Sequence, residues 1–368
     1  MIVGVLGGGQ LGRMLALAGP PLGIEVRCLE RTADAPAGAV APLTVGDPDD
    51  PAVLGAFAAG VDVLTYEIEG IATDTLAGVV ATTPLRPPLR ALTTASDRWR
   101  EKSLLGELGI PVPRTLAVDD ADALDRAVAD LGACVVKTRR GGYDGRGQAV
   151  VRGTGDSAGR TAARVLLGAP GGLVAEELVA FDAEVSVLGA RGTDGAVAVW
   201  PLVRNTHVDG ILRRSEVPAR VPAAVEALAA SYLSRLRAAL DHVGVLALEL
   251  FVVPGPDGPA LLANEMAPRV HNSGHWTPEG SETGQFEQHL RAVSGLPLGA
   301  TAARGPSVML NLLGTLPEVA DVLAVPGAHL HLYGKEPRPG RKLGHVTLTA
   351  ADDAELAGRL ERLTRVLP

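Results

Sequence analysis

The first ninety residues alternate short apolar runs with segments of helical periodicity, and this alternation limits the fold more than any other feature of the sequence. Apolar runs at residues 2–6, 25–29 and 61–66 predict strands, and apolar side chains recur at helical spacing between residues 10 and 22. Strands that alternate with helices are typical of a parallel sheet. We therefore expect a parallel α/β domain at the start of the chain.

The joint between the first strand and the first helix is rich in glycine and reads GGGQLG at residues 7–12. Glycines there let a ligand approach the N-terminus of a helix, whose free N–H groups favour an anion. Glu30, 18 residues after Gly12, completes the pattern of a dinucleotide site. The residues alone leave three interpretations open: a small phosphorylated substrate, a nicotinamide or flavin, or a tight turn without a ligand.

The length of 368 residues allows two or three domains. Three prolines at residues 84–89 predict a linker, and a second unit begins near Thr93 with a capped helix. Further strands are expected at 133–138, 148–152, 172–177, 183–190 and 196–203, a core helix at 222–243, and two antiparallel strands at 245–253 and 260–266 around the turn PGPDGP. From about residue 296, the strand-like segments SVMLNLLG, AHLHLYG and KLGHVTLT precede a final helix at 353–363.

Composition excludes several classes of protein. The net charge of −8 argues against a nucleic-acid partner, because such proteins concentrate basic residues on one face. The two cysteines, Cys28 and Cys134, sit in apolar runs, which argues against a disulfide framework and against a cysteine-ligated zinc site. No apolar run reaches the roughly 20 residues that cross a bilayer, and the start MIVGVLGGG does not resemble a signal peptide. We expect no membrane partner and a cytoplasmic protein.

A lysine that leaves an apolar strand, Lys137, is followed by the loop RRGGYDGRGQ, with four glycines at residues 141–147. A point charge next to a flexible cover is what a nucleoside triphosphate needs, although the Walker pattern is absent. The alternative is a surface hairpin. Against it stands the crowding of Lys137, Arg139, Arg140 and Arg146, which we expect to need an anion.

Two acids interrupt otherwise apolar strands, Glu249 in ALELF and Glu265 in ANEMAP. The turn between the strands should bring them together, and buried carboxylates are costly unless they are neutralised. We interpret them, with Asn264 beside them, as a Mg²⁺ site. The alternative is that both acids pair with nearby arginines.

Two further segments carry many polar donors. The run RVHNSGHW at residues 269–276 directly follows the proposed metal ligand and is typical of a substrate wall, whereas a zinc site would need a different spacing. The run KEPRPGRK at residues 335–342 is a basic turn in an acidic protein. It is either a solvated loop or a clamp for a phosphate group.

Taken together, these segments resemble the ATP-grasp enzymes and, among them, the N5-carboxyaminoimidazole ribonucleotide synthetase family, the ATPase-subunit type of phosphoribosylaminoimidazole carboxylase. The resemblance covers nearly the whole chain and is carried by GGGQLGRML, TYEIE, GGYDGRGQ, EVSVLGARG, NEMAPRVHNSGHW, SVMLNLLG and KEPRPGRKLGH. It implies an ATP-grasp fold of mixed α/β and α+β type. The implied domains are a Rossmann-like parallel α/β domain at 1–92, an ATP-grasp domain at 93–295 with a small lid at about 114–178, and a small β-rich C-terminal domain at 296–368.

The resemblance also implies an activity. Members of the family use ATP and bicarbonate to carboxylate the exocyclic amine of 5-aminoimidazole ribonucleotide in purine biosynthesis, through carboxyphosphate, and release ADP and phosphate. The implied cofactors are ATP and Mg²⁺, and the implied assembly is a homodimer. Mg²⁺, Lys137 and the loop amides would stabilise the charge that moves over the phosphates.

Site residues follow from the same resemblance. ATP would contact Arg98, Lys137, Gly142, Tyr143, Asp144, Gly145, Arg146, Gly147, Gln148, Glu176, Glu177, Leu178, Val179, Glu184, His207, Asn264 and Glu265, and the metal would be held by Glu249 and Glu265. The ribonucleotide would lie against Gln10, Leu11 and Glu67, with Lys335, Arg341 and Lys342 around its phosphate. The reacting centre would comprise Tyr143, Asp144, Arg146, Arg269, His271 and Asn272. Arg269 would hold carboxyphosphate, and Asp144 is the preferred base, with His271 as the second candidate.

Two other functions compete with this one. The segments RTADAPA and EIEGIATDTL are similar to the formate-dependent glycinamide ribonucleotide transformylase of the same fold. GGYDGRGQ and RVHNSGHW favour carboxylation instead. An NAD-linked oxidoreductase rests only on the N-terminal glycine pattern.

Overall fold

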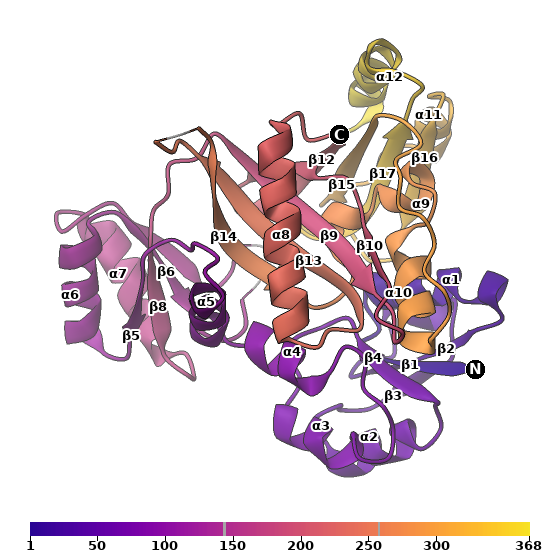
Figure 1. Ribbon diagram of the computed structural model, residues 1–368, viewed down its shortest axis with the longest axis horizontal. Coiled ribbons are helices and arrows are strands. Elements are labelled where there is room, and N and C mark those ends of the chain that lie inside the picture. Colours follow the sequence, from indigo (N-terminus) through magenta and orange to yellow (C-terminus); the bar gives the residue numbers. More distant parts are fainter. Residues whose placement is uncertain (143–144, 257) are drawn as a thin grey trace.

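Three β-sheets organise the chain in the computed structural model (Figure 1). The structure describes residues 1–142, 145–256 and 258–368, so two of the predicted site residues, Tyr143 and Asp144, lie outside the described residues. Cys28 and Cys134 are buried and free, as the sequence predicts. Within the described part of the chain, none of the helices has the length and apolar character needed to cross a membrane.

The N-terminal sheet is parallel throughout, which confirms the prediction from the alternating pattern. Its order is β3-β2-β1-β4, formed by β1 (Ile2–Leu6), β2 (Glu25–Glu30), β3 (Leu43–Val45) and β4 (Val63–Tyr66). Helices α1 (Gln10–Ala18) and α2 (Pro51–Ala58) and the 3₁₀ turns η1 (Pro20–Leu22) and η2 (Pro36–Ala39) connect its strands, and α3 (Thr73–Val79) follows β4. The whole unit lies at the lower right of Figure 1.

The proline-rich segment at 84–89 is more than the linker that we expected. Leu85 pairs in parallel with Leu64 at the β4 edge of this sheet. The Leu64 N–H donates to the Pro84 carbonyl at 2.8 Å, and the Arg86 N–H donates to the Leu64 carbonyl at 2.9 Å. Proline is tolerated at a sheet edge because no ladder bond is asked of its nitrogen. The segment therefore covers an edge that would otherwise be open.

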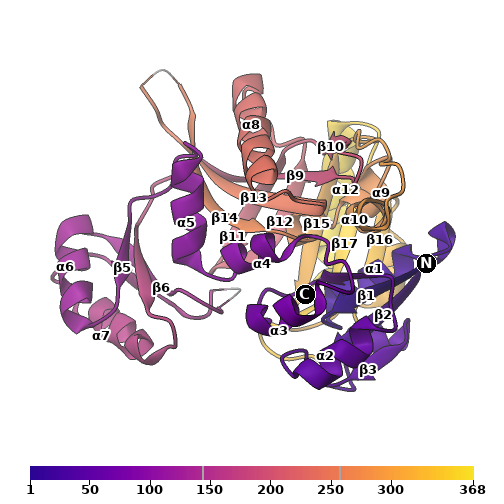
Figure 2. The same ribbon diagram turned by 60° about the horizontal axis from the view of Figure 1, so that its bottom comes forward.

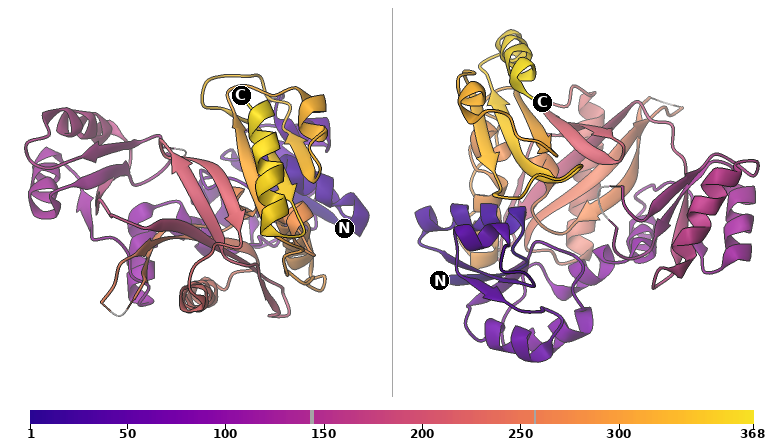
Figure 3. Two further views of the ribbon diagram at one scale, coloured as in Figure 1. Left: turned by 90° about the horizontal axis from the view of Figure 1, so that it is seen from above. Right: turned by 180° about the vertical axis from the view of Figure 1, so that it is seen from behind.

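A small antiparallel sheet stands at one end of the molecule (Figures 1 and 3). Its order is β5-β8-β6-β7, with β5 (Thr115–Val118), β6 (Cys134–Thr138), β7 (Gln148–Val151) and β8 (Leu173–Glu177). Helices α6 (Ala121–Leu131) and α7 (Ser157–Val165), followed by η3 (Leu166–Gly168), pack on it around a core of their own. Two helices, α4 (Leu89–Ala95) and α5 (Arg98–Glu107), precede it in the chain.

The central sheet is antiparallel and runs in the order β14-β13-β9-β11-β12-β15-β17-β16. Its strands are β9 (Ala183–Arg191), β11 (Val203–Val208), β12 (Ile211–Val217), β13 (Gly244–Val253), β14 (Ala260–Ala267), β15 (Ser307–Leu313), β16 (Ala328–Leu332) and β17 (Lys342–Thr349), with β10 (Val197–Val199) paired to β9. The single strand expected at 196–203 is thus wrong, because β10 and β11 are separate. Pro201 lies between them and lacks the N–H that a continuous ladder would use.

The two faces of this sheet are covered by different helices. Along β13, Leu246, Leu248 and Leu250 belong to the core under α8 (Ala223–Ala239), whereas Val245 and Ala247 belong to the core with α10 (Gln285–Ser294). Figure 2 shows α8 lying along β13 and β9. The helix is a core helix as predicted, but it ends at Ala239, with Leu240 as its C-cap, and not at residue 243. Glu249 follows the alternation of Val245 and Ala247, so it faces away from α8.

The C-terminal residues extend the central sheet and add a separate apolar core. β15 pairs with β12, and η4 (Asn272–Gly274) and α9 (Thr277–Gly280) lead from β14 toward this part of the chain. Helices α11 (Val319–Leu323) and α12 (Asp353–Val366) pack against the last strands in a cluster that includes Val308, Val346 and Leu363. The final helix therefore continues three residues beyond its expected end.

Candidate active site

The two predicted metal ligands face each other across neighbouring strands. Glu249 on β13 stands directly opposite Glu265 on β14, and the next pair is Leu250 with Ala263. Asn264 is thus the extra residue of a β-bulge. In a regular strand Ala263 and Glu265 would point to the same face, the α8 face. The bulge reverses that relation and turns Glu265 to the face that carries Glu249.

Burial and like charge perturb Glu249, whereas Glu265, which we also expected to be buried, is exposed. Burial raises the pKa of Glu249 to about 7, and the nearby carboxylates of Glu265 and Glu184 contribute to the rise, while His207 opposes it. On the neighbouring strands the His207 imidazole contacts the Glu184 carboxylate through Nδ1. Burial alone would lower the pKa of His207, but the Glu184 contact and the charge of Glu249 outweigh it, so that pKa is raised.

His271 lies next to the acidic pair, with its Nε2 3.4 Å from Glu249 Oε1. Its Nδ1 contacts Ser273 Oγ at 2.8 Å, and its backbone N–H donates to Gln285 Oε1 at 2.9 Å. Burial lowers its pKa well below the ordinary value, and the charges of Arg269 and Lys342 lower it further. His271 is therefore a neutral imidazole at physiological pH.

Arg269 lies in the same region, and its Nε is a buried donor without a partner among the described residues. Its guanidinium contacts Glu69 Oε1 at 3.0 Å and donates to its neighbour's carbonyl, Val270 O, at 3.1 Å. Its Nε is buried without a partner, as is Nδ2 of Asn272 at the start of η4. Buried N–H groups without a partner are rare in proteins and indicate a place for a ligand acceptor.

Two lysines meet one buried acid between the small sheet and the central sheet. Lys137 Nζ donates to Glu176 Oε2 at 2.7 Å, and Lys102 Nζ lies 3.6 Å from Glu176 Oε1. Burial would raise the pKa of Glu176, but the two lysines outweigh burial and hold it below the ordinary value. Burial lowers the pKa of Lys102, although Glu176 opposes that shift.

Arg98 holds the glycine-rich loop through hydrogen bonds to backbone carbonyls of the loop and of the strand before it. The Arg98 guanidinium donates to the carbonyls of Thr138 at 2.7 Å, Gly141 at 2.6 Å and Gly142 at 3.2 Å. All four loop glycines have φ between 66° and 77°, a backbone that other residues rarely adopt. Arg146 and Gln148 at the far side of the loop are exposed.

The arginines before the loop do not need an external anion, which corrects our expectation. Asp97 accepts from Arg139 at 2.9 Å and lies 3.5 Å from the Arg140 guanidinium. Burial would raise the pKa of Asp97, but the Arg139 bond outweighs it and the pKa falls. The crowding of positive charge is thus compensated within the protein and cannot by itself indicate a phosphate site.

At the end of β8 and just after it, the chain passes four of the predicted ATP contacts, residues 176–179. Glu176 is buried, Glu177 is exposed, and Leu178 is 43% exposed while its N–H donates to the Ala133 carbonyl at 3.0 Å. Val179 follows in a loop and is partly buried. Leu178 thus offers an exposed apolar side chain next to a backbone that is fixed by a hydrogen bond, and such a surface suits a flat aromatic base.

At the N-terminal glycine loop, two acids of the protein itself take the free N–H groups. Glu67 accepts from Gly9 and, at 2.7 Å, from Gly12, and Glu30 accepts from the Gly8 N–H at 3.0 Å. Burial raises the pKa of Glu67 although these amides oppose it. Leu11 is buried in the core. These loop amides already have partners within the protein, so they are not available to bind the pyrophosphate of a dinucleotide.

The structure joins this loop to the C-terminal basic turn. Lys335 Nζ donates to Gln10 Oε1, although the two residues are 325 positions apart. Arg341 donates to the Glu336 carbonyl at 3.1 Å within the turn. Lys342 begins β17, and its charge acts on Glu249 and His271. The three basic residues thus lie in different parts of the site. Lys335 lies at the N-terminal loop, Arg341 lies within the turn, and Lys342 lies nearer to Glu249.

Four charged residues around the site were missed from the sequence: Glu69, Asp97, Glu101 and Lys102. Glu101 and Lys102 lie on α5 and are only 3% and 4% exposed. Burial raises the pKa of Glu101 to about 8, and Lys102 opposes the rise. The sequence did contain a signal for their burial. Glu101 and Lys102 precede the fully buried Leu105 by four and three positions, so all three residues lie on the same face of the helix.

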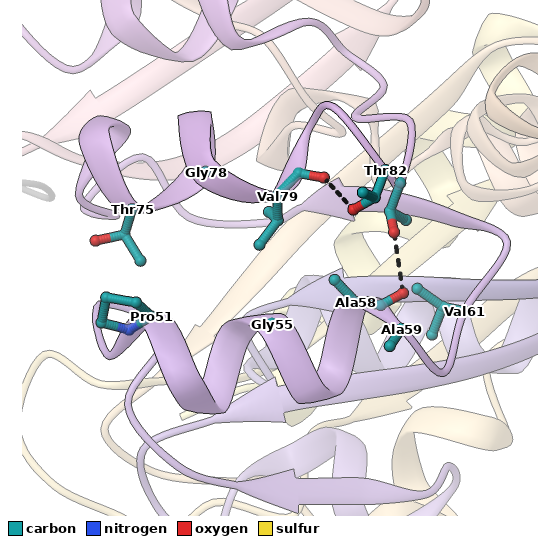
Figure 4. A pocket seen from close by; sticks show the side chains of 10 residues that line it. Pro51, Gly55, Ala58, Ala59, Val61, Thr75, Gly78, Val79 and Thr82 are labelled. Carbon is teal, nitrogen blue, oxygen red and sulfur yellow. Dashed lines mark hydrogen bonds between the residues drawn. The ribbon is translucent and has the colours of Figure 1, made fainter.

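A cavity of about 620 Å³ in the N-terminal domain has a different character (Figure 4). It lies between α2 and α3, and Pro51, Gly55, Thr75 and Val79 are among its lining residues. None of the residues that line it carries an ionisable side chain. It therefore lacks the groups that phosphoryl transfer needs.

Family models match the ribonucleotide synthetase preATP-grasp domain at residues 1–96, the ATP-grasp domain at 103–286 and the phosphoribosylaminoimidazole carboxylase C-terminal domain at 307–359. The N5-carboxyaminoimidazole ribonucleotide synthase of Pseudomonas aeruginosa is 47% identical over 368 residues, which cover 100% of this chain and 99% of that protein.

Solved structures give the same result. The N5-carboxyaminoimidazole ribonucleotide synthetase of Thermus thermophilus is 49% identical with a TM-score of 0.91, over 99% of this chain and 98% of that one. The Aspergillus clavatus synthase, in complex with ADP and 5-aminoimidazole ribonucleotide, is 32% identical with a TM-score of 0.90 over the same shares. The ATP-grasp fold predicted from the sequence is confirmed.

Proposed function

This chain belongs to the N5-carboxyaminoimidazole ribonucleotide synthase family, and from that premise we propose how its residues perform the ATP-dependent conversion of 5-aminoimidazole ribonucleotide to N5-carboxyaminoimidazole ribonucleotide in purine biosynthesis. The observation that carries the site assignment is the register that sets Glu249 opposite Glu265. Around this pair lie the lysines, Arg269 and His271, and each has a role in the proposal.

Mg²⁺ is the proposed metal, and Glu249 and Glu265 are its proposed ligands. Among the residues that the structure describes, no cluster of three or more histidine, cysteine or acidic side chains could hold a metal by itself. That fits Mg²⁺, which is usually bound by one or two carboxylates together with substrate phosphates. The raised pKa of Glu249 supports the fit, because a cation there would relieve the repulsion between the acids. When bound, the ion would neutralise charge on the phosphates.

ATP is proposed to lie between the small sheet and the central sheet. The adenine would contact residues 176–179, Glu184 and His207 would lie at the ribose, and Lys137 with the backbone of residues 142–148 would contact the phosphates. Asn264 lies next to the proposed ligand Glu265. Arg98 supports the loop through its carbonyls, so we propose that it orients the loop in addition to any contact with ATP.

The proposed chemistry begins with bicarbonate. Its oxygen attacks the γ-phosphorus, ADP leaves, and the product carboxyphosphate delivers its carbon to the exocyclic amine while phosphate leaves. The buried Nε of Arg269 and Nδ2 of Asn272 would donate to the anion. Asp144 is our proposed acceptor of the proton from the amine, with Tyr143 and Arg146 also assigned to the reacting centre. His271, which is neutral because burial lowers its pKa, is the second candidate.

The ribonucleotide is proposed to lie where the N-terminal loop meets the C-terminal basic turn. Gln10 and Leu11 begin α1, and Lys335 already reaches Gln10. A carboxylate offers about four acceptor positions, so Glu67 could accept from ribose hydroxyls as well as from the two amides that it holds. Lys335 would bind the phosphate, with Arg341 close by and Lys342 directed toward the reacting centre.

The test is ADP release with alternative acceptors. We expect turnover to require 5-aminoimidazole ribonucleotide and to rise with bicarbonate. Faster turnover with glycinamide ribonucleotide and formate would refute carboxylation in favour of the transformylase alternative. An NAD-linked activity predicts NAD(H) binding by calorimetry, which we expect to be absent because Glu30 and Glu67 occupy the loop amides.

Three further expectations remain proposals. We propose a homodimer on the strength of the family resemblance, which light scattering of the purified protein would test. We propose a cytoplasmic location, because ATP and phosphorylated ribonucleotides are cytoplasmic metabolites. We also retain the division into domains at 1–92, 93–295 and 296–368, with a lid at about 114–178, which limited proteolysis would test.

A further inference from the structure

The proposed metal ligand Glu265 lies on the edge strand of the central sheet. β14 is the first strand in the sheet order and pairs only with β13 among the described strands. An edge strand leaves a row of backbone N–H and C=O groups without ladder partners. The bulge at Asn264 adds further groups without partners at the point where Glu265 must turn.

Helix α5 supplies those partners through two ionisable side chains. Lys102 Nζ donates to the carbonyls of Ala263, at 3.3 Å, and Asn264. Glu101 Oε1 accepts from the Met266 N–H. These contacts fix the backbone on both sides of Glu265, one residue before it and one residue after it.

Protection of the edge alone does not explain this choice of residues. Lysine and glutamate are almost never fully buried unless they are paired, yet both are at most 4% exposed. A neighbouring loop can do the same work, as the Pro111 carbonyl does when it accepts from the Ala263 N–H at 2.7 Å. The two buried ionisable side chains, Glu101 and Lys102, bond to the backbone at the bulge, where the direction of the Glu265 side chain is decided.

We propose that Glu101 and Lys102 are positioning residues that hold the β14 bulge and thereby keep Glu265 opposite Glu249 for the metal. The inference rests on the proposed function, because it assigns the metal to that pair. Lys102 also lies 3.6 Å from Glu176, which binds Lys137. The same helix therefore contacts both the metal strand and the acid that orients a phosphate-binding lysine.

The test has two measurements: the Mg²⁺ dependence of ATP binding by calorimetry, which needs no turnover, and the Mg²⁺ concentration that gives half-maximal ADP release at saturating ATP, bicarbonate and 5-aminoimidazole ribonucleotide. Loss of partners that orient a metal ligand typically costs about 10- to 100-fold in metal affinity or activity. We expect Lys102→Met and Glu101→Ala to raise the Mg²⁺ requirement by about 10-fold, with the KM for the ribonucleotide changed less than twofold. Glu101→Gln keeps an acceptor for the Met266 N–H and should restore most of the loss.

Arg235→Met is the matched control. Arg235 donates to the carbonyls of Leu108 at 2.8 Å and Gly109 at 3.2 Å, just beyond α5, so its loss removes a similar contact far from Glu265. We expect it to lower thermal stability and to leave the Mg²⁺ requirement unchanged.

Each outcome decides a separate point. If wild-type ADP release needs neither Mg²⁺ nor the ribonucleotide, the proposed function fails. If the wild type behaves as expected but Glu101→Ala keeps the wild-type Mg²⁺ requirement, or Arg235→Met raises it equally, the inference fails. Should Lys102→Met not fold, the Glu101 pair still gives the answer.

Discussion

Glu249→Gln should make the metal-free protein more stable while it removes activity. Burial, the opposing Glu265 and the nearby Glu184 raise the pKa of Glu249 from 4.5 to about 7. The native protein therefore binds this proton more tightly than the unfolded chain does. Its free energy of unfolding must fall as the pH rises from about 4.5 to about 7, and the loss is complete above that range.

The size of the effect follows from the pKa. A tenfold change in proton affinity corresponds to about 1.4 kcal/mol. A rise in the pKa of Glu249 from 4.5 to about 7 therefore makes about 3 kcal/mol of the free energy of unfolding depend on pH. Glutamine has nearly the same shape and does not titrate. Glu249→Gln should thus exceed the wild type by about 3 kcal/mol at pH 8 and lose that advantage toward pH 5.

Urea unfolding in the presence of a chelator and without nucleotide measures this difference. The fluorescence of Trp200 and Trp276 is a suitable signal, since both are buried in the core of the central sheet. Glu216→Gln is the control, because Glu216 lies on β12 of the same sheet with Arg214 at 2.7 Å. Its removal should cost at most about 1 kcal/mol. An advantage of Glu249→Gln that is absent at pH 8, or equal at pH 5 and pH 8, would refute the repulsion argument.

Three other substitutions test separate parts of the structure. Glu69→Gln releases the partner that holds Arg269 at 3.0 Å, so the KM for bicarbonate should rise more than the KM for ATP in initial-rate measurements; equal increases would contradict a role at the anion. Lys335→Met removes the cation at Gln10 and should raise the KM for 5-aminoimidazole ribonucleotide by about tenfold or more, as expected for a lost charged hydrogen bond, with little change for ATP. Thr65→Val breaks the buried 2.8 Å contact between Thr65 Oγ1 and His289 Nε2, which links β4 to α10; thermal unfolding should report a loss of about 1–3 kcal/mol, and an unchanged melting temperature would show that the contact does not join the domains.

The hairpin that carries the acids could be predicted because local signals agree. Each acid interrupts an apolar strand, and PGPDGP can only be a turn, so antiparallel pairing of the two strands follows. The bulge could not be predicted. Nothing in ALLANEMA marks Asn264 as an extra residue, and strict alternation would have turned Glu265 toward α8. The bulge depends on partners from α5, which lies about 160 positions earlier in the chain.

Charged helical residues were harder to interpret than charged strand residues. In a strand, one acid among apolar neighbours is conspicuous, whereas Glu101 and Lys102 in RWREKSLLGE look like an ordinary solvent-facing pair. Glu101 and Lys102 are buried because the edge of β14 lies beside the helix, and this tertiary contact cannot be read from the local sequence. For the same reason the arginines before the glycine loop seemed to require a phosphate, while Asp97, 42 positions away, already compensates Arg139.

The contrast between Glu176 and Glu249 shows how such buried charges can be sorted. Both carboxylates are buried, but Lys137 and Lys102 lower the pKa of Glu176, whereas burial, together with the nearby acids Glu265 and Glu184, raises the pKa of Glu249. A buried acid whose charge is compensated inside the protein needs no further partner and serves to orient its lysines. An acid that lacks such compensation is the place where an added cation gains most. Electrostatics therefore distinguishes the proposed metal ligand Glu249 from the orienting acid Glu176, although their burial is similar.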